Sequence, residues 1–187
     1  MFLASGRFDD AKAALDKFIA ASPEHVDALV TRARVGVKRG KPLAAADDFA
    51  RAIALSPRPE PEFYIERAQA LLAAGDDRIA DALRCLDEGT ARLGNLPTLG
   101  LYAIELEVRQ KHFGGALARL DKLSATSPRK EAWLERRGDI LSTAGRLEDA
   151  RQAYRAAGEA ILALPANRRV TKATAELEER LKQKAAR

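Results

Sequence analysis

A repeat with a period of 35 residues constrains this chain more than any other feature of its sequence. Four times, a small residue follows a large apolar one by four positions, and successive small residues stand 35 positions apart. A period of this length indicates a stack of similar supersecondary units, each of which buries its apolar side against its neighbours. The small residues are Ala33, Ala68, Ala103 and Gly138, and the large ones are Leu29, Tyr64, Leu99 and Leu134.

A second set of columns keeps nearly the same period. Here a large apolar residue follows an alanine by four positions, and successive pairs are 34 to 37 residues apart. Three prolines, Pro23, Pro57 and Pro128, close units of the pattern. Two sets of columns in step indicate that each unit contains two packed elements. The pairs are Ala11/Leu15, Ala45/Phe49, Ala82/Leu86, Ala116/Leu120 and Ala150/Tyr154.

Both elements of each unit read as amphipathic helices, because apolar residues recur at spacings of three and four. A glycine that takes the left-handed conformation ends the first helix at low cost. The segments "GRFDDA" at 6–11 and "GRLEDA" at 145–150 are therefore corners of helical hairpins, with acids at the positive start of the second helix. The predicted pairs are 24–38 with 43–55, 61–74 with 78–92, 98–110 with 114–124, and 130–143 with 147–163, and the corner glycines are Gly6, Gly40, Gly75 and Gly145.

These columns resemble the tetratricopeptide repeat, a helix–turn–helix unit of 34 residues with the pattern W-x2-L-G-x2-Y…A-x3-F…P. The resemblance covers about residues 6–164. It has departures: the fourth unit carries Gln110 at the corner, and the leucine column is largely arginine. Two of these arginines follow an aromatic residue by four positions, so each guanidinium can lie on the neighbouring ring. The leucine column holds Arg32, Arg67, Tyr102 and Arg137, and the aromatic neighbours are Phe63 and Trp133.

The pattern and the composition together predict an all-α fold. Aromatic residues make up only 5% of the chain and charged residues 32%, which suits stacked helices better than a β-sheet. We expect one domain, a right-handed α-solenoid of antiparallel helix pairs with a C-terminal capping helix. Its expected parts are a half repeat 1–25, repeats 26–59, 60–96, 97–130 and 131–165, and the capping helix 166–187.

After Pro165 the pattern stops, and a last helix is expected at about 169–184. Its narrow apolar stripe fits the terminal element that covers the last exposed core of a solenoid. Residues 165–187 carry seven basic and three acidic residues, and so hold +4 of the net charge of +5. We interpret this basic surface as a solvated face, with contact to an anionic membrane or to RNA as the alternative. The stripe consists of Val170, Ala173, Leu177 and Leu181.

The sequence carries few residues in patterns that support catalysis. His25 and His112 stand at distant helix corners without further metal ligands at helical spacing, so we predict no metal site and no cofactor. Cys85, the only cysteine, falls among apolar residues and is expected to be a buried small hydrophobe, not a nucleophile. No phosphate-binding loop, nucleophile elbow or zinc-binding helix motif occurs. We therefore predict that the chain is not an enzyme.

The resemblance implies where a partner would bind. In tetratricopeptide repeat proteins, the first helices of the pairs line a concave groove that commonly takes an extended peptide or a helix of another protein. Carried over to this sequence, the groove has basic residues at one end and acids at the other. Such a groove selects a ligand of matching polarity, and ordinary solvated charges are the alternative. The groove residues are Arg34, Lys38, Ile65, Gln69, Leu72, Ile104, Glu107, Glu135 and Asp139.

The predicted function is that of a non-catalytic scaffold for protein–protein interaction, with a protein or peptide partner. No nucleic-acid partner is expected, because the basic residues do not spread along the body. One alternative is an oligomerisation element, in which Leu15 and Phe18 form a dimer patch at the N-terminal edge. Another is a regulatory arm of a larger multidomain protein.

The sequence constrains the cellular compartment of the protein less than it constrains the fold. No apolar run approaches the ~20 residues that a membrane span needs, and the first residues lack the features of a signal peptide. We expect a soluble protein, cytoplasmic or periplasmic, and the alanine- and arginine-rich composition suggests a bacterial source. The opening segment "MFLASG" reads as the last turn of a helix, so the chain is expected to be a fragment.

Overall fold

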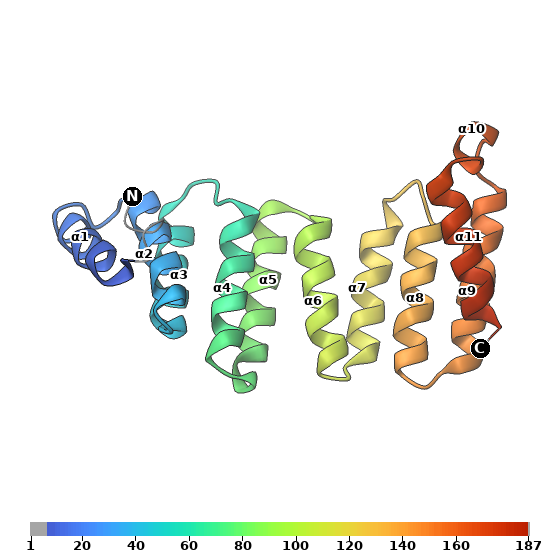
Figure 1. Cartoon of the computed structure of the whole chain (residues 1–187), viewed down its shortest axis with the longest axis horizontal. Helices are drawn as coiled ribbons and strands as arrows, with labels where there is room; N and C mark the ends of the chain where they lie inside the picture. Colours follow the sequence, from blue (N-terminus) through green and yellow to red (C-terminus); the bar gives the residue numbers. More distant parts are fainter. Residues whose placement is uncertain (1–6, 187) are drawn as a thin grey trace. The chain divides into compact units, whose positions relative to one another are not determined.

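The computed structural model describes residues 7–186, and these residues form helices joined by turns, with no strand among them. They make up two compact units, which meet between Ala103 and Ile104, inside α6 (Pro97–Arg109). Within each unit, neighbouring helices run in alternating directions (Figure 1). The predicted all-α, helical-repeat class is confirmed. The corner predicted at Gly6 and the turn before it lie outside the described residues.

The N-terminal unit contains one single helix and two antiparallel pairs before α6. In α3 and α4 the first residue is proline, which suits this position because its missing N–H would have no partner there. A short 3-10 turn, η1, lies between α4 and α5. The elements are α1 (Phe8–Ala21), α2 (Val26–Lys38), α3 (Pro42–Leu55), α4 (Pro61–Ala74), η1 (Asp76–Arg78) and α5 (Ile79–Leu93).

The C-terminal unit continues the alternation. After the second half of α6 come α7 (Phe113–Ala125), α8 (Glu131–Thr143) and α9 (Leu147–Leu162). Two further helices follow, α10 (Ala166–Arg169), which is a single turn, and α11 (Lys172–Ala185).

The small-residue columns mark the places where helices touch. Ala33, Ala68 and Ala103 are buried, as are all five alanines of the second column set. At the fourth position of the first column the contact is tighter still. A β-carbon at Gly138 would lie 2.3 Å from Cε1 of Tyr154, far inside van der Waals distance. The repeat in the sequence is therefore a repeat of close helix–helix approaches.

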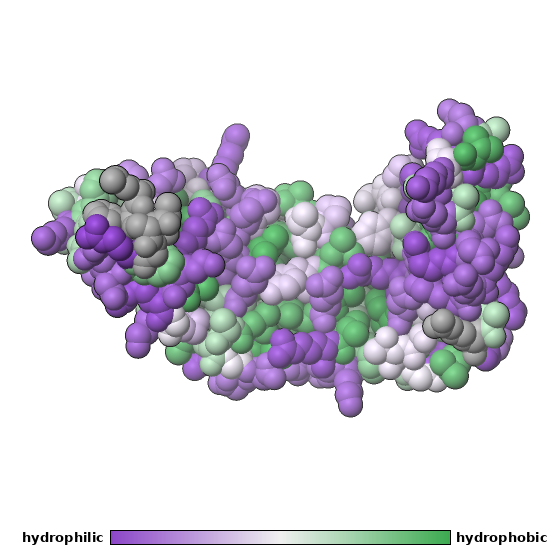
Figure 2. All heavy atoms as spheres, viewed as in Figure 1, coloured by the Kyte–Doolittle hydropathy of each residue, from purple (hydrophilic) through white to green (hydrophobic). Residues whose placement is uncertain are grey.

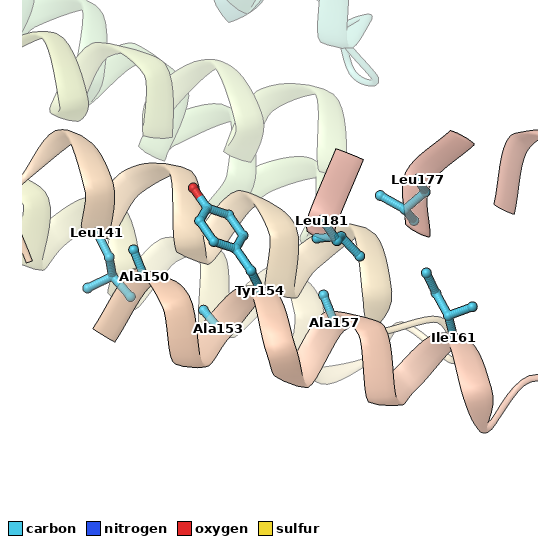
Figure 3. Packing of buried hydrophobic residues seen from close by; sticks show 8 residues of the cluster. All are labelled: Leu141, Ala150, Ala153, Tyr154, Ala157, Ile161, Leu177 and Leu181. Carbon is cyan, nitrogen blue, oxygen red and sulfur yellow. The ribbon is translucent and has the colours of Figure 1, made fainter. Parts of the chain in front are cut away.

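The core of the C-terminal unit joins α8, α9 and α11. Figure 3 shows the ring of Tyr154 projecting away from α9, with alanines of that helix on either side of its base. Leu177 and Leu181 of α11 complete this cluster, and both are buried. Burial of apolar area at roughly 25 cal/mol per Å² is the main force that holds α11 on α9.

Three hairpin corners share one hydrogen-bonding pattern. The N–H groups of Lys41, His112 and Arg146 donate to carbonyls five residues earlier, at 2.9, 2.8 and 2.9 Å. The residue before each donor is left-handed, with φ of 66° at Gly40, 59° at Lys111 and 76° at Gly145. This arrangement is a Schellman motif, which satisfies carbonyls at the end of a helix. The prediction that Gln110 occupies the corner was wrong by one residue, because the left-handed position falls on Lys111.

Replacing Lys111 with glycine is expected to raise the free energy of unfolding by about 0.5 to 1 kcal/mol, since a side chain in the left-handed region costs about that much. The reverse change, Gly145→Ala, is expected to lower it by about 1 kcal/mol, although a β-carbon there meets nothing within 4 Å. Urea denaturation followed by circular dichroism measures both changes. A loss of stability in Lys111→Gly would contradict this account of the corner.

The C-terminal helix differs from the prediction at its start. Thr171 caps α11 by accepting a hydrogen bond from the N–H of Thr174 at 3.2 Å, so the helix begins at Lys172 and not near Arg169. This cap shifts the buried stripe: Thr174 is buried, whereas Val170 and Ala173 are exposed. Leu177 and Leu181 are buried as predicted.

Candidate functional site

The first-helix face of the N-terminal unit, defined here as the side of α2 and α4 that carries the predicted groove residues, contains a hollow. Arg34 and Lys38 of α2 and Gln69 of α4 are exposed and line this hollow, whose volume is about 390 Å³. The buried ring of Phe49, from α3, is also among its walls. The structure thus brings together three predicted residues from two different repeats.

The two cations of this hollow differ. Nε and Nη2 of Arg34 donate to the two carboxylate oxygens of Glu66 at 2.8 and 2.7 Å. These hydrogen bonds raise the pKa of Arg34 above its ordinary value. Lys38 makes no such ion pair with any residue that the structure describes. Lys38 is therefore the charge that this hollow offers to a ligand.

A second hollow, of about 420 Å³, adjoins the first at Val37, which lines both. It lies at the α2–α3 corner and is bounded by Leu43 and, from α4, by Ala73. Val37 is 41% exposed and Leu43 is 46% exposed, so both present apolar surface to the solvent. Lys41 stands at its edge. The residues of this corner were missed in the sequence, because only positions on the first helix of each pair were considered as groove residues.

The C-terminal unit brings two of the four groove residues predicted there into one hollow. Ile104 of α6 and Asp139 of α8 line a space of about 340 Å³. Ile104 itself is buried, so it contributes little surface to a partner. A cross-helix ion pair closes the same space, since Nη2 of Arg136 donates to Glu105 at 3.0 Å.

Glu107 does not lie in the predicted groove but between α6 and α7. Its carboxylate is buried against α7, where a β-carbon at Gly115 would lie 2.8 Å from both oxygens. Nε of Arg119, also on α7, donates to Glu107 at 3.0 Å. Glu107 therefore holds two helices of the C-terminal unit together and presents no carboxylate on the first-helix side.

The remaining two predicted acids are paired with α11. Nε and Nη2 of Arg180 donate to the carboxylate of Glu135 at 2.7 and 3.1 Å. Nζ of Lys184 donates to Glu135 at 2.9 Å and to Asp139 at 2.7 Å. These two basic residues of α11 are thus paired with acids of α8, which the sequence analysis did not anticipate. The acidic end of the predicted groove is neutralised by the chain's own C-terminal helix.

These ion pairs show which place α11 takes in its unit. Arg34–Glu66 joins two successive first helices of the N-terminal unit, and Arg136–Glu105 joins two of the C-terminal unit. Arg180–Glu135 joins α11 to α8 in the same manner. α11 therefore packs like the first helix of a further pair, and the segment with α10 lengthens the connection to it.

Acid is expected to weaken the attachment of α11. The hydrogen bonds from Arg180, and then from Lys184, hold the pKa of Glu135 below its ordinary value of 4.5, against the opposing effect of burial. A lowered folded-state pKa gives stabilisation that is complete above the unfolded value and is lost as the pH falls through the folded value. Near neutral pH, the free energy of unfolding of the wild type is expected to exceed that of Glu135→Gln by about 1 kcal/mol. Urea denaturation near pH 7 and near pH 3 tests this, and a gap that persists in acid would contradict it.

The residues considered for catalysis take structural positions. Cys85 is buried, and burial raises the pKa of its thiol to about 11, so it carries no thiolate at neutral pH. Nδ1 of His25 accepts a hydrogen bond from the N–H of Ala28 at 3.2 Å and so caps α2. His112 stands before the first residue of α7. Within residues 7–186 no cluster of three metal-binding side chains occurs, and no helix is long and apolar enough to span a membrane.

The arginines of the leucine column make ion pairs that sequence reasoning did not anticipate. Nη1 of Arg137 donates to Asp121 at 2.6 Å, and Nη1 of Arg67 donates to Glu88 at 3.4 Å. Arg32 is the most enclosed of the three and lies between two aspartates, Asp16 and Asp48. These guanidinium groups therefore connect neighbouring helices through carboxylates.

Comparison with known proteins gives a consistent assignment. A model described as a tetratricopeptide repeat-like domain matches residues 69–179, more than half of the chain, and a tetratricopeptide repeat model matches residues 2–59. A comparison with curated proteins found no match.

Several solved structures have a similar fold. The crystal structure of MamA is 18% identical, with a TM-score of 0.64 over 85% of this chain and 91% of that chain. YrrB, described as a TPR protein with an unusual peptide-binding site, is 14% identical, with a TM-score of 0.61 over 97% and 87%. A thermophilic TPR protein from Thermus thermophilus is 20% identical, with a TM-score of 0.55 over 100% and 94%.

At these identities the structures show likeness of fold alone, whereas the family models match the sequence itself. The chain therefore belongs to the tetratricopeptide repeat family, whose helical repeats serve as scaffolds for protein–protein interaction.

Proposed function

We propose that this chain is a non-catalytic scaffold that holds a segment of a partner protein on the first-helix face of its N-terminal unit. The observation that carries this proposal is the pair of adjoining hollows that meet at Val37. They combine exposed apolar side chains with lysines that have no carboxylate partner among the described residues. Binding pockets for side chains have this composition, mostly apolar with a few placed polar groups.

The chemistry of the two hollows defines the ligand. An aliphatic or aromatic side chain of the partner fits against Val37 and Leu43, which together offer the apolar surface. A carboxylate of the partner would pair with Lys38 or Lys41, which stand at the rims. The amide of Gln69 can both donate to and accept from a peptide backbone. The partner segment thus carries an acidic residue close to an apolar one.

The other predicted groove residues have graded roles in this proposal. Ile65 and Leu72 lie four residues before and three residues after Gln69 on α4, so all three share one side of the helix. Both are half-buried, and we assign them to the same face. In the C-terminal unit, the hollow at Asp139 offers a second contact. Arg34 lines the first hollow together with its partner Glu66. Glu107 and Glu135 are instead engaged in ion pairs within the C-terminal unit, and we assign them no contact with the partner.

The test is capture of partners from a lysate of the source cells. The Lys38→Glu/Lys41→Glu variant is expected to lose partners that the wild-type chain retains, because it reverses the charge at both rims. The control, Lys17→Glu/Arg58→Glu, makes the same change of net charge at two other exposed positions of the same unit. A third variant, Val37→Ser, removes the apolar contact without changing the charge.

The proposal that partners bind on the first-helix face would be supported by partners that both Lys38→Glu/Lys41→Glu and Val37→Ser lose but the control keeps. Titration of the captured protein by calorimetry should then show at least tenfold weaker binding for either variant, since a charge pair or an apolar anchor is worth about 1.4 kcal/mol or more at an interface. Equal retention by all four proteins would refute the proposal.

One observation favours a second candidate function, self-association through α1. Phe18 is 46% exposed and its ring meets that of His25 edge-on at 5.0 Å. Leu15, one turn earlier, is half-buried. Sedimentation velocity over a range of concentrations would show a dimer that Phe18→Ser abolishes. A monomer at all concentrations would exclude this function.

A further inference from the structure

The segment from the end of α9 to the start of α11 carries the two most exposed large apolar side chains of the described residues. Val170 is 82% exposed and Leu162 is 63% exposed. Both belong to the segment with α10, at the end of the C-terminal unit (Figure 1). Figure 2 shows an apolar group among hydrophilic ones at this place. We call residues 160–175 the tip.

Hydrogen bonds hold the tip in a defined shape. The N–H groups of Arg168 and Arg169 both donate to the carbonyl of Pro165, at 2.9 and 3.0 Å. The hydroxyl of Thr174 donates to the carbonyl of Arg168 at 2.9 Å, which ties the turn to the first turn of α11. Because the backbone is fixed at both ends, the outward position of Val170 follows from the fold.

The tip has a positive charge that no acidic residue within it offsets. Between Glu159 and Glu176 the sequence contains no acidic residue but holds Arg168, Arg169 and Lys172. Nη1 of Arg169 donates to the backbone carbonyl of Leu162 at 3.2 Å, so this cation lies beside an exposed apolar residue. Lys172 meets Glu176 only at 3.8 Å, where both side chains are well exposed.

Elsewhere in the unit many basic residues are engaged, although Lys111 and Arg155 make no ion pair among the described residues. Arg119, Arg136 and Arg137 donate to carboxylates of neighbouring helices, and Arg180 and Lys184 do the same. The tip is thus a place where both positive charge and apolar surface are left available. Apolar surface combined with basic residues is the composition of segments that bind at the surface of anionic membranes.

We propose that the tip docks on the surface of an anionic phospholipid bilayer. Val170 and Leu162 enter the headgroup region, and Arg168, Arg169 and Lys172 pair with lipid phosphates. The exposure of the two apolar residues argues for a lipid surface. A side chain as exposed as Val170 projects from its surroundings and forms no pocket for a partner, whereas a fluid interface closes around it. The binding is peripheral and reversible, since no helix of the described residues can cross a membrane.

The strength expected is moderate. Each basic residue near an anionic surface contributes about fivefold to partitioning, and this contribution is screened by salt. The apolar side chains add a hydrophobic contribution to the free energy of binding, and salt does not weaken this contribution. Binding should therefore fall steeply with ionic strength but not vanish for the wild-type chain.

The experiment is co-flotation of the full chain with vesicles. One set contains phosphatidylcholine alone, and the other contains about 30% phosphatidylserine, which is enough to attract basic segments. Two tip variants are compared with wild type: Arg168→Glu/Arg169→Glu, which reverses the charge, and Val170→Ser, which leaves the charge intact. The control is Lys38→Glu/Lys41→Glu, which changes the net charge equally on the N-terminal unit. Circular dichroism confirms equal helix content.

The wild-type chain and the control are expected to float with the anionic vesicles and not with the neutral ones. The charge-reversed tip should bind at least twentyfold more weakly, and Val170→Ser severalfold more weakly. Absence of flotation in the wild type, or equal loss in the control, would overturn the proposal. So would binding to RNA or heparin that depends on the tip while vesicles stay unbound, since this would assign the tip to an anionic polymer.

Discussion

Asp48→Ala is expected to lower the free energy of unfolding by about 3 kcal/mol, because breaking a buried ion pair leaves an uncompensated charge. Asp48 lies on α3, with a side chain only 11% exposed, and it accepts hydrogen bonds from Nε and Nη2 of Arg32 at 2.7 and 2.6 Å. Nη1 of Arg32 donates to Asp16 of α1 at 3.0 Å. One guanidinium thus links three helices of the N-terminal unit.

The large expected loss in the free energy of unfolding follows from the burial of Arg32 and Asp48, not from the distance between their charges. Arg32 is 21% exposed at its side chain, and its hydrogen bonding to the carboxylate of Asp48 is the largest of the effects that raise its pKa. Arg32 remains charged in the variant, because a guanidinium does not lose its proton in proteins, and it has lost two of its three hydrogen bonds to carboxylates. Asp16 alone cannot replace them, since it already pairs with Lys12.

A matched control exists in the same unit. Arg39, which follows the last residue of α2, and Asp9 of α1 also form an arginine–aspartate pair, at 2.7 Å, but Asp9 is 86% exposed. Asp9→Ala is expected to change stability by less than about 0.5 kcal/mol. Urea denaturation of both variants makes the comparison. A double variant, Arg32→Met/Asp48→Leu, is expected to recover most of the loss, because apolar replacements remove the unpaired charge. Equal effects of Asp48→Ala and Asp9→Ala would contradict the role given to burial.

Gly138→Ala is expected to lower the free energy of unfolding by about 2 kcal/mol, although alanine favours a helix by about 1 kcal/mol over glycine. The added β-carbon would lie within 2.3 to 2.8 Å of three ring atoms of Tyr154. The ring cannot easily move, since it is buried and its hydroxyl donates to Asp139 at 2.9 Å. Relief would require α8 and α9 to separate.

Gly158 provides the control, because it lies inside α9 and a β-carbon there meets nothing within 4 Å. Gly158→Ala is therefore expected to raise stability by about 0.5 to 1 kcal/mol. The two substitutions should thus have opposite signs in thermal or urea denaturation. If Tyr154 is the obstacle, Gly138→Ala/Tyr154→Leu should cost less than the sum of its two single changes. Strict additivity would show that the strain arises elsewhere.

The two proposed surfaces are tested by variants that serve each other as controls. Lys38→Glu/Lys41→Glu is expected to abolish partner capture and to leave vesicle binding intact, while Arg168→Glu/Arg169→Glu should show the reverse. Either proposal can therefore fail alone. Joint loss in one variant, at unchanged helix content, would indicate an effect of net charge and not of a site.

The positions of the helices followed from the sequence, because they depend on local patterns. Spacings of three and four placed the helices of every pair to within a few residues, and the small columns identified contacts such as Ala33 and Gly138. Tyr154 and Phe49 were recognised as core residues for the same reason. The corner at Lys111 was missed by one position, since a lysine gives no sign that its φ is positive.

The roles of the charged residues were decided only by the tertiary structure. Arg34, Glu107, Glu135 and Asp139 read as groove charges in the sequence, but each carboxylate or guanidinium meets a partner on another helix. A long charged side chain reaches several neighbours, and no periodicity states which of them it meets. Lys38, in contrast, has no carboxylate partner among the described residues. The side chain of Val170 is left exposed to solvent. The repeat pattern by itself determined an all-α stack of helix pairs in this protein, because burial of apolar residues is periodic. Which charges stay free to bind was settled by helix packing, since pairing of charges depends on distance in space and not on position in the chain.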